Sequence, residues 1–134
     1  MVNTDLLRVL GDEHIDFDRL KELVSEVKEW SLEIDSVAVE FVVRRRITQL
    51  MAKFESKPFD ARPLEIVNAI LGATQQLSLN CDLWEAQNIY FSVGQGMYHN
   101  MKKKSKNNRR AEYWIQHFDC AGDYLRVNVP DDLS

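Results

Sequence analysis

The sequence predicts an all-α fold, an antiparallel bundle of about five helices in one domain that spans residues 1–134. Apolar residues recur at intervals of three and four along most of the chain, which is the helical period. Only three prolines and five glycines interrupt it, which is few for an all-β or disordered chain. The connections between the apolar stretches are short, and short connections favour antiparallel neighbours.

The first long helix is expected over residues 16–33. Phe17, Leu20, Val24 and Val27 form its apolar stripe, and charged residues occupy the other face. Asp16 is a suitable N-cap because its carboxylate can accept a hydrogen bond from the first turn. We expect a short helical turn before it, over residues 4–10.

The second helix is expected over residues 35–56. Its first half, VAVEFVV, is apolar nearly all round, which predicts the most buried helix of the bundle. The same run is β-branched, so a strand is the alternative. We favour a helix because the spacing of three and four continues to Phe54, and Pro58 then ends the element.

Three further helices are predicted. One begins at Asp60, which can cap it, with Pro63 in its first turn, and ends near residue 77. The next begins at Asp82 as a second cap and extends to about residue 101. The last spans about residues 111–125, and the residues after Arg126 are expected to form a tail.

The charge of the chain is unevenly distributed. The net charge is −4, which disfavours nucleic acid as a partner of the whole protein. Residues 102–110, KKKSKNNRR, nevertheless carry six positive charges and no acid, so the remainder sums to −10. The two cysteines are too few for a disulfide framework, and we see neither a leader peptide nor a membrane span. These features predict a cytoplasmic protein without membrane partners.

Motifs for catalysis and for metal or cofactor binding are not found in the sequence. No glutamate has a histidine three residues later, as a carboxylate-bridged metal bundle requires. His117 and Cys120 form a single H-x-x-C pair, which we interpret as chance spacing. Cys81 lies near a predicted helix start, where a helix dipole can lower a thiol pKa, but it has no partner nearby in the sequence. We therefore predict no catalytic residues, no metal and no cofactor.

The basic tract, residues 102–110, has three interpretations. The first is a solvated loop between helices. The second is a patch for phosphate or nucleic acid, because clustered cations release counterions on binding. The third is contact with an acidic protein surface. The six cations that would form the patch are Lys102, Lys103, Lys104, Lys106, Arg109 and Arg110.

The most distinctive segment is LWEAQNIYF, residues 83–91. Gln87 and Asn88 are adjacent amides in an otherwise apolar helix start, and buried amides need hydrogen-bond partners. We expect them to bond a neighbouring helix or a backbone carbonyl. The alternative is a ligand or partner groove formed by Trp84, Gln87, Asn88 and Phe91, in which Trp84 stacks on a sugar whose hydroxyls the amides bind. An enzyme with a pocket around this segment is a third, weaker hypothesis.

Residues 43–90, with the Arg44, Arg45 and Arg46 run, the Pro58-Phe59-Asp60 turn and the LWEAQNIYF segment, resemble a C-terminal helical domain of unknown function. In that family the domain is attached to catalytic barrels of the glycoside hydrolase family 57 type. The resemblance covers about a third of the chain and implies an accessory module beside a carbohydrate-active barrel. No catalytic residue can be carried over, because the catalytic carboxylates of the family would lie in the barrel.

The leading hypothesis is a non-catalytic helical module that binds another protein or a second copy of itself, in association with a carbohydrate-active enzyme. Carbohydrate is a further candidate ligand. The alternative is a small nucleic-acid or phosphate-binding module that uses the basic tract.

Overall fold

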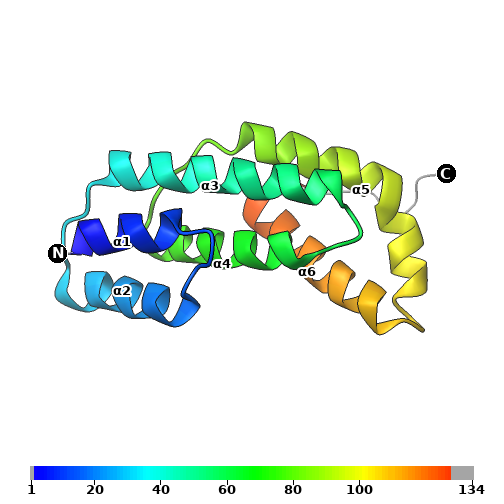
Figure 1. Cartoon of the computed structure of the whole chain (residues 1–134), viewed down its shortest axis with the longest axis horizontal. Helices are drawn as coiled ribbons and strands as arrows, with labels where there is room; N and C mark the ends of the chain where they lie inside the picture. The colour runs from blue at the N-terminus through cyan, green and yellow to red at the C-terminus, as the bar shows by residue number, and fades with distance from the viewer. Residues whose placement is uncertain (1, 128–134) are drawn as a thin grey trace. The chain divides into compact units, whose positions relative to one another are not determined.

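The computed structural model describes residues 2–127, which form six helices and no strand (Figure 1). In chain order these are α1 (Val2–Gly11), α2 (Phe17–Trp30), α3 (Ser36–Ser56), α4 (Arg62–Gln76), α5 (Trp84–Lys104) and α6 (Arg109–Leu125). The all-α prediction is confirmed, with one helix more than expected because the short N-terminal turn is a full helix. The arrangement as one antiparallel bundle stays a prediction.

The helices are divided between two compact units. Unit 1 comprises Met1–Ile47 and Ala69–Asp82, and unit 2 comprises Thr48–Asn68 and Leu83–Ser134. The first part of α3 and the last part of α4 therefore belong to unit 1, and the remainder of both helices belongs to unit 2. The predicted tail lies outside the described residues from residue 128 onward.

In unit 1, α1 and α2 form an antiparallel helical hairpin (Figure 1). Asp16 accepts a hydrogen bond from the backbone N–H of Arg19, so the predicted N-cap of α2 is confirmed. Leu20, Val24 and Val27 of the predicted α2 stripe are buried, as are Leu6 and Leu10 of α1. Phe17, the first member of that stripe, is instead 37% exposed. Arg19 also reaches back to Asp5 of α1, at 3.3 Å.

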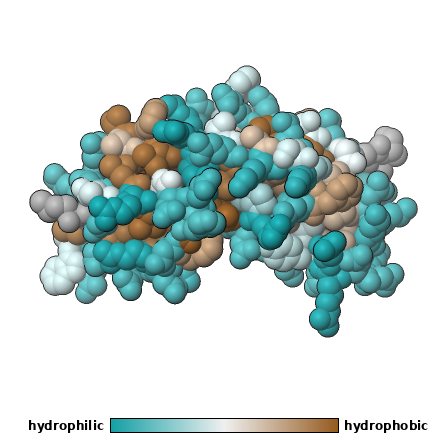
Figure 2. Space-filling model, viewed as in Figure 1, coloured by the Kyte–Doolittle hydropathy of each residue, from teal (hydrophilic) through white to brown (hydrophobic). Residues whose placement is uncertain are grey.

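The first half of α3 is less buried than its composition predicts. Val39 and Val43 are fully buried, whereas Val37 is 76% exposed and Phe41 is 55% exposed. The prediction that this segment belongs to the most buried helix is therefore wrong, because α3 presents only one side to the rest of unit 1. Figure 2 shows hydrophobic surface over the first turns of this helix.

Unit 2 is built around an aromatic cluster. The Phe118 ring stacks on Trp114 of the same helix at 4.5 Å and on Tyr90 of α5 at 4.0 Å between ring centroids. Phe54, near the end of α3, lies 6.3 Å from Trp114. The Tyr90 hydroxyl donates to the backbone carbonyl of Phe118 at 2.8 Å. Since a buried hydroxyl needs a partner, this bond lets a tyrosine occupy the core and fixes α5 against α6.

The starts and ends of the helices follow simple capping rules. Asp60 accepts from the backbone N–H of Arg62, the first residue of α4. The helix was expected to begin at Asp60 and begins two residues later. Asn108 caps α6 by accepting from two backbone N–H groups, so this helix begins before the expected residue 111. The N-cap position of α5 belongs to Leu83, not to Asp82 as predicted, and the Leu83 side chain cannot accept a hydrogen bond.

Candidate functional site

Four exposed side chains of α5 form one stripe, which we term the α5 outer face. They lie four, three and four residues apart and are Trp84, Asn88, Phe91 and Gln95. Trp84 is 65% exposed and Phe91 is 40% exposed. The buried stripe of the same helix packs into unit 2, so this spacing directs aromatic rings and amides away from the core.

The predicted groove consisted of Trp84, Gln87, Asn88 and Phe91. Three of these residues are exposed on the α5 outer face, whereas Gln87 is not. Gln87 is half-buried, and its Nε2 donates to the backbone carbonyl of Leu125 at 2.8 Å. It is thus a link between α5 and the end of α6, in agreement with the expected bond to a backbone carbonyl. Asn88 instead is exposed beside the two aromatic residues.

Three residues of the α5 outer face, Asn88, Phe91 and Gln95, lie in a long uncharged segment, and Trp84 precedes it, next to the exposed Glu85. Residues 86–101 contain no Asp, Glu, Lys or Arg, although seven of these sixteen residues are exposed. An exposed helical surface ordinarily carries charged side chains. Gln95 was missed as a site residue in the sequence analysis, and the absence of charge over more than four helical turns is the signal that points to it.

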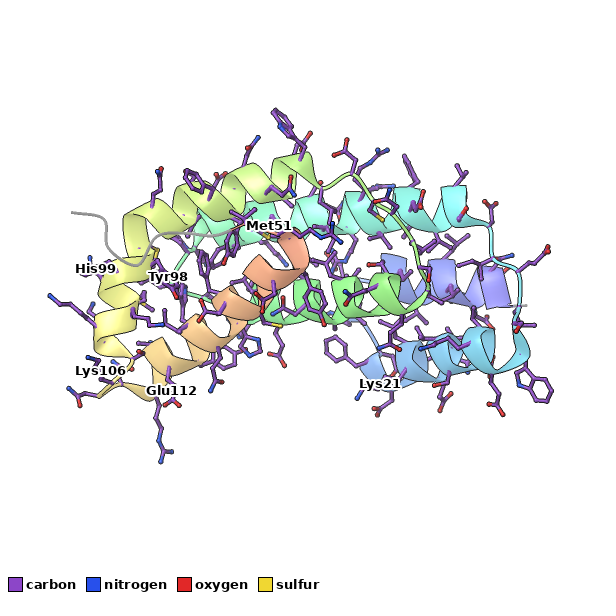
Figure 3. The ribbon with its side chains drawn as sticks, turned by 180° about the vertical axis from the view of Figure 1, so that it is seen from behind. Lys21, Met51, Tyr98, His99, Lys106 and Glu112 are labelled. Atoms are coloured by element: carbon purple, nitrogen blue, oxygen red, sulfur yellow. The ribbon has the colours of Figure 1, made fainter. Side chains whose placement is uncertain are left out.

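The basic tract is only partly a loop. Its three consecutive lysines lie in the last turn of α5, residues 105–108 form the connection, and its two arginines begin α6. All six cationic side chains are exposed. In Figure 3, Lys106 extends from this connection, and α5 is bent near His99. The interpretation of the whole tract as a loop is therefore corrected to a helix end, a short turn and a helix start.

Lys102, the first residue of the tract, contacts the hydroxyl of Tyr98, a buried residue of unit 2. Tyr98 donates its hydroxyl hydrogen to Asp119 of α6 at 2.9 Å, and the Lys102 ammonium lies 3.5 Å from the same hydroxyl. Burial raises the pKa of Tyr98, and the hydrogen bond to Asp119 raises it further. Tyr98 therefore stays a donor at neutral pH and positions the start of the tract.

A pocket of about 580 Å³ opens on unit 2 beside the tract. Phe59, Asp60, Ala61 and Arg62 line it from the connection before α4 and the first residue of that helix, and Arg110 and Tyr113 line it from the first turns of α6. This volume lies within the range of small-molecule sites. Arg110 is the one pocket residue that the predicted anion patch includes.

The polar side chains of the pocket wall are held by hydrogen bonds. Arg62 forms a two-pronged ion pair with Asp60, with Nη2 2.8 Å and Nε 3.0 Å from its carboxylate oxygens. The hydrogen bond from Arg62 lowers the pKa of Asp60, so that carboxylate is charged at neutral pH. The Tyr113 hydroxyl donates to Glu65 at 2.6 Å. Burial, with this bond, raises the pKa of Tyr113 to about 12.

The thiols and histidines form no reactive cluster in the described part of the chain. Burial raises the pKa of Cys81, the opposite of the shift that thiol activation requires. Cys120 is exposed, and the His117 ring of the H-x-x-C pair packs on Tyr113 with centroids 4.4 Å apart. Within residues 2–127, no group of three or more His, Cys, Asp or Glu side chains is placed to hold a metal ion.

Comparison with known proteins does not assign the chain to a family. No family model matches the chain, and no curated protein or solved structure is significantly similar to it. None of the described helices has the length and hydrophobicity needed to span a membrane. Functional inference therefore depends on the α5 outer face, the basic tract and the pocket.

Proposed function

We propose that this chain is a non-catalytic helical interaction module that binds protein through the α5 outer face, with a second copy of itself as the partner. The observation that carries the proposal is the uncharged segment, residues 86–101, on an exposed helix that also presents Trp84 and Phe91. The cores of protein interfaces are depleted in charged residues and enriched in aromatic ones.

A second copy suits this face because of its lack of charge. In a two-fold dimer the same surface patch meets itself, so a charged patch would oppose its own charge. Asn88 and Gln95 each carry both a donor and an acceptor, and amides can therefore pair with amides across a two-fold axis. The Trp84 and Phe91 rings supply the apolar area that such a contact buries.

Sedimentation velocity of the full chain over the micromolar concentration range tests this proposal. We expect a monomer–dimer equilibrium that changes little between about 0.15 M and 1 M salt, because no ion pair holds the interface. Trp84→Ala and Phe91→Ala should each weaken dimerisation by about tenfold or more. Both side chains are exposed, so the circular dichroism of the variants should match that of the original chain.

Phe41→Ala is the matched control, because Phe41 is a similarly exposed phenylalanine on α3 in unit 1. It should leave the dimer unchanged. A chain that stays monomeric at every concentration contradicts the proposal, as does a dimer that tolerates both α5 substitutions.

The association with a carbohydrate-active enzyme is part of this proposal and is supported by the family resemblance of residues 43–90. An aromatic ring beside exposed amides is also a surface on which a sugar can stack. Calorimetric titration with a soluble glucan tests direct binding, and Trp84→Ala should abolish the heat of binding. Hydrolysis of the glucan by the purified chain would refute the non-catalytic part of the proposal.

A further inference from the structure

The pocket on unit 2 combines two features that small anionic ligands with a flat ring require. One feature is aromatic surface: Phe59 is 70% exposed, and Tyr113 also lines the cavity. The other is positive charge, since Arg110 lines the same cavity. Phe59 and Arg110 lie 51 positions apart in the chain, and only the packing within unit 2 brings them to one pocket.

The pocket is preformed because its walls are tied to the core of unit 2. The Trp114 indole N–H donates to the backbone carbonyl of Pro58 at 2.6 Å, directly before Phe59. The backbone N–H of Asp60 donates to the carbonyl of Lys57, which closes the turn that presents the Phe59 ring. A ring that is exposed on a fixed turn loses little conformational entropy when a ligand stacks on it.

Among the charged side chains that line the pocket, one positive charge is left over, and Glu65, which accepts from Tyr113, does not itself line the pocket. Asp60 and Arg62 neutralise one another through their two-pronged ion pair. Arg110 forms no ion pair within residues 2–127, so its guanidinium is available for an anion. Guanidinium binds phosphate oxygens in a two-pronged geometry, which a lysine ammonium cannot provide.

We propose that this pocket binds a nucleotide, with the base stacked on Phe59 and Tyr113 and the phosphate on Arg110. The basic tract supports a nucleotide over other anionic aromatic ligands. The basic tract ends at Arg110, carries five further exposed cations and contains no acid. A strand whose phosphates lead away from the pocket would need such a run of cations. Stacking on aromatic side chains next to a cationic groove is the common mode of single-strand binding.

The same chemistry is offered by a free nucleotide and by a nucleotide within a single strand. Calorimetric titration of the full chain with adenosine monophosphate at low salt tests the first source. Anisotropy of a short labelled oligo(dA) strand tests the second. Binding of either ligand is expected to weaken about tenfold or more in Phe59→Ala and in Arg110→Gln. Adenosine alone and inorganic phosphate alone should bind more weakly than the nucleotide.

Two controls separate the pocket from general electrostatics. Lys21→Gln removes an exposed cation of α2 in unit 1, and it should leave binding unchanged (Figure 3). Lys103→Gln removes a cation of the tract outside the pocket. It should not affect the free nucleotide, and for the strand it should reduce the slope of log affinity against log salt by about 0.7.

Three results would overturn the proposal. The first is no saturable binding of either probe at low salt. The second is strand binding that Lys103→Gln weakens but Phe59→Ala does not, which would assign binding to the tract alone. The third is an acidic peptide that competes more strongly than the strand. The inference goes beyond the proposed dimerisation and does not depend on it, because Phe59 and Arg110 lie outside the α5 outer face.

Discussion

Gly122 is the position in α6 where the packing of unit 2 leaves no room for a side chain. A Cβ built on it overlaps the Tyr90 hydroxyl oxygen and lies 3.0 Å from Tyr90 Cζ and 3.1 Å from the carbonyl oxygen of Val127. The Tyr90 ring cannot easily move aside, because it stacks on Phe118 and its hydroxyl bonds the Phe118 carbonyl. We therefore predict that Gly122→Ala destabilises the protein.

The size of the effect follows from opposing contributions. Alanine is favoured over glycine inside a helix by about 1 kcal/mol. Overpacking of a well-packed core costs about 1–3 kcal/mol. Displacement of the Tyr90 hydroxyl also sacrifices a buried hydrogen bond, at about 1 kcal/mol. The net expectation is a loss of about 1–3 kcal/mol in the free energy of unfolding, measured by urea denaturation followed by circular dichroism.

Gly96→Ala provides the matched control in α5. A Cβ at Gly96 meets no atom within 4 Å, so the same substitution should stabilise the protein by about 0.5–1 kcal/mol. A second test is the Tyr90→Phe background, in which the overlapping oxygen is gone and Gly122→Ala should cost less. If Gly122→Ala raises the urea midpoint as Gly96→Ala does, the close packing of Tyr90 on α6 is refuted.

Three further predictions concern unit 2. Asn108→Ala removes the α6 cap and should lower the free energy of unfolding by about 1 kcal/mol in urea melts, with Asn107→Ala as the unchanged control. Trp114→Phe leaves the Pro58 carbonyl without its indole donor and should cost about 1–3 kcal/mol in the same assay; an unchanged midpoint would mean that this bond contributes nothing. The raised pKa of Tyr113 means that the unfolded chain releases this proton first. Stability is therefore fully present below the ordinary pKa of 10.0 and declines toward about pH 12, and Tyr113→Phe should flatten that decline in alkaline urea melts. The difference in ultraviolet absorbance between the original folded chain and Tyr113→Phe should show the Tyr113 phenolate only near pH 12, and a difference that appears near pH 10 would contradict the pKa shift.

Local sequence signals predicted most of the helices, because each signal acts within a few residues. Asp16 caps α2 through the third residue after it, and Pro58 follows the end of α3. The same locality explains the error at Leu83, since Asp82 is a good capping residue by type but does not occupy the N-cap position of α5. It also explains why the run VAVEFVV was expected in the most buried helix although Phe41 within it is exposed, because composition does not tell which sides of an apolar helix contact other helices.

The candidate sites were harder to predict because their parts come from distant positions. Arg110 was recognised from the basic tract, yet its neighbour in the pocket, Phe59, belongs to a turn that looked only like a helix boundary. Gln87 and Asn88 are adjacent in sequence and equal in polarity. Gln87 is structural because it bonds the carbonyl of Leu125, 38 positions away, whereas Asn88 is exposed. A contact between such distant positions cannot be read from the local sequence.

Charge is segregated along α5 and the start of α6 in a way that separates the two proposals experimentally. Residues 86–101 carry no charged side chain, and residues 102–110 carry six cations. Contacts of an uncharged face are insensitive to ionic strength, whereas nucleotide phosphates bound by arginine and lysine are released as salt rises. Dimerisation that persists in high salt while strand binding is lost would assign one activity to each segment. Loss of both at the same salt concentration would mean that the cations also hold the dimer, and the uncharged face would then not be its interface.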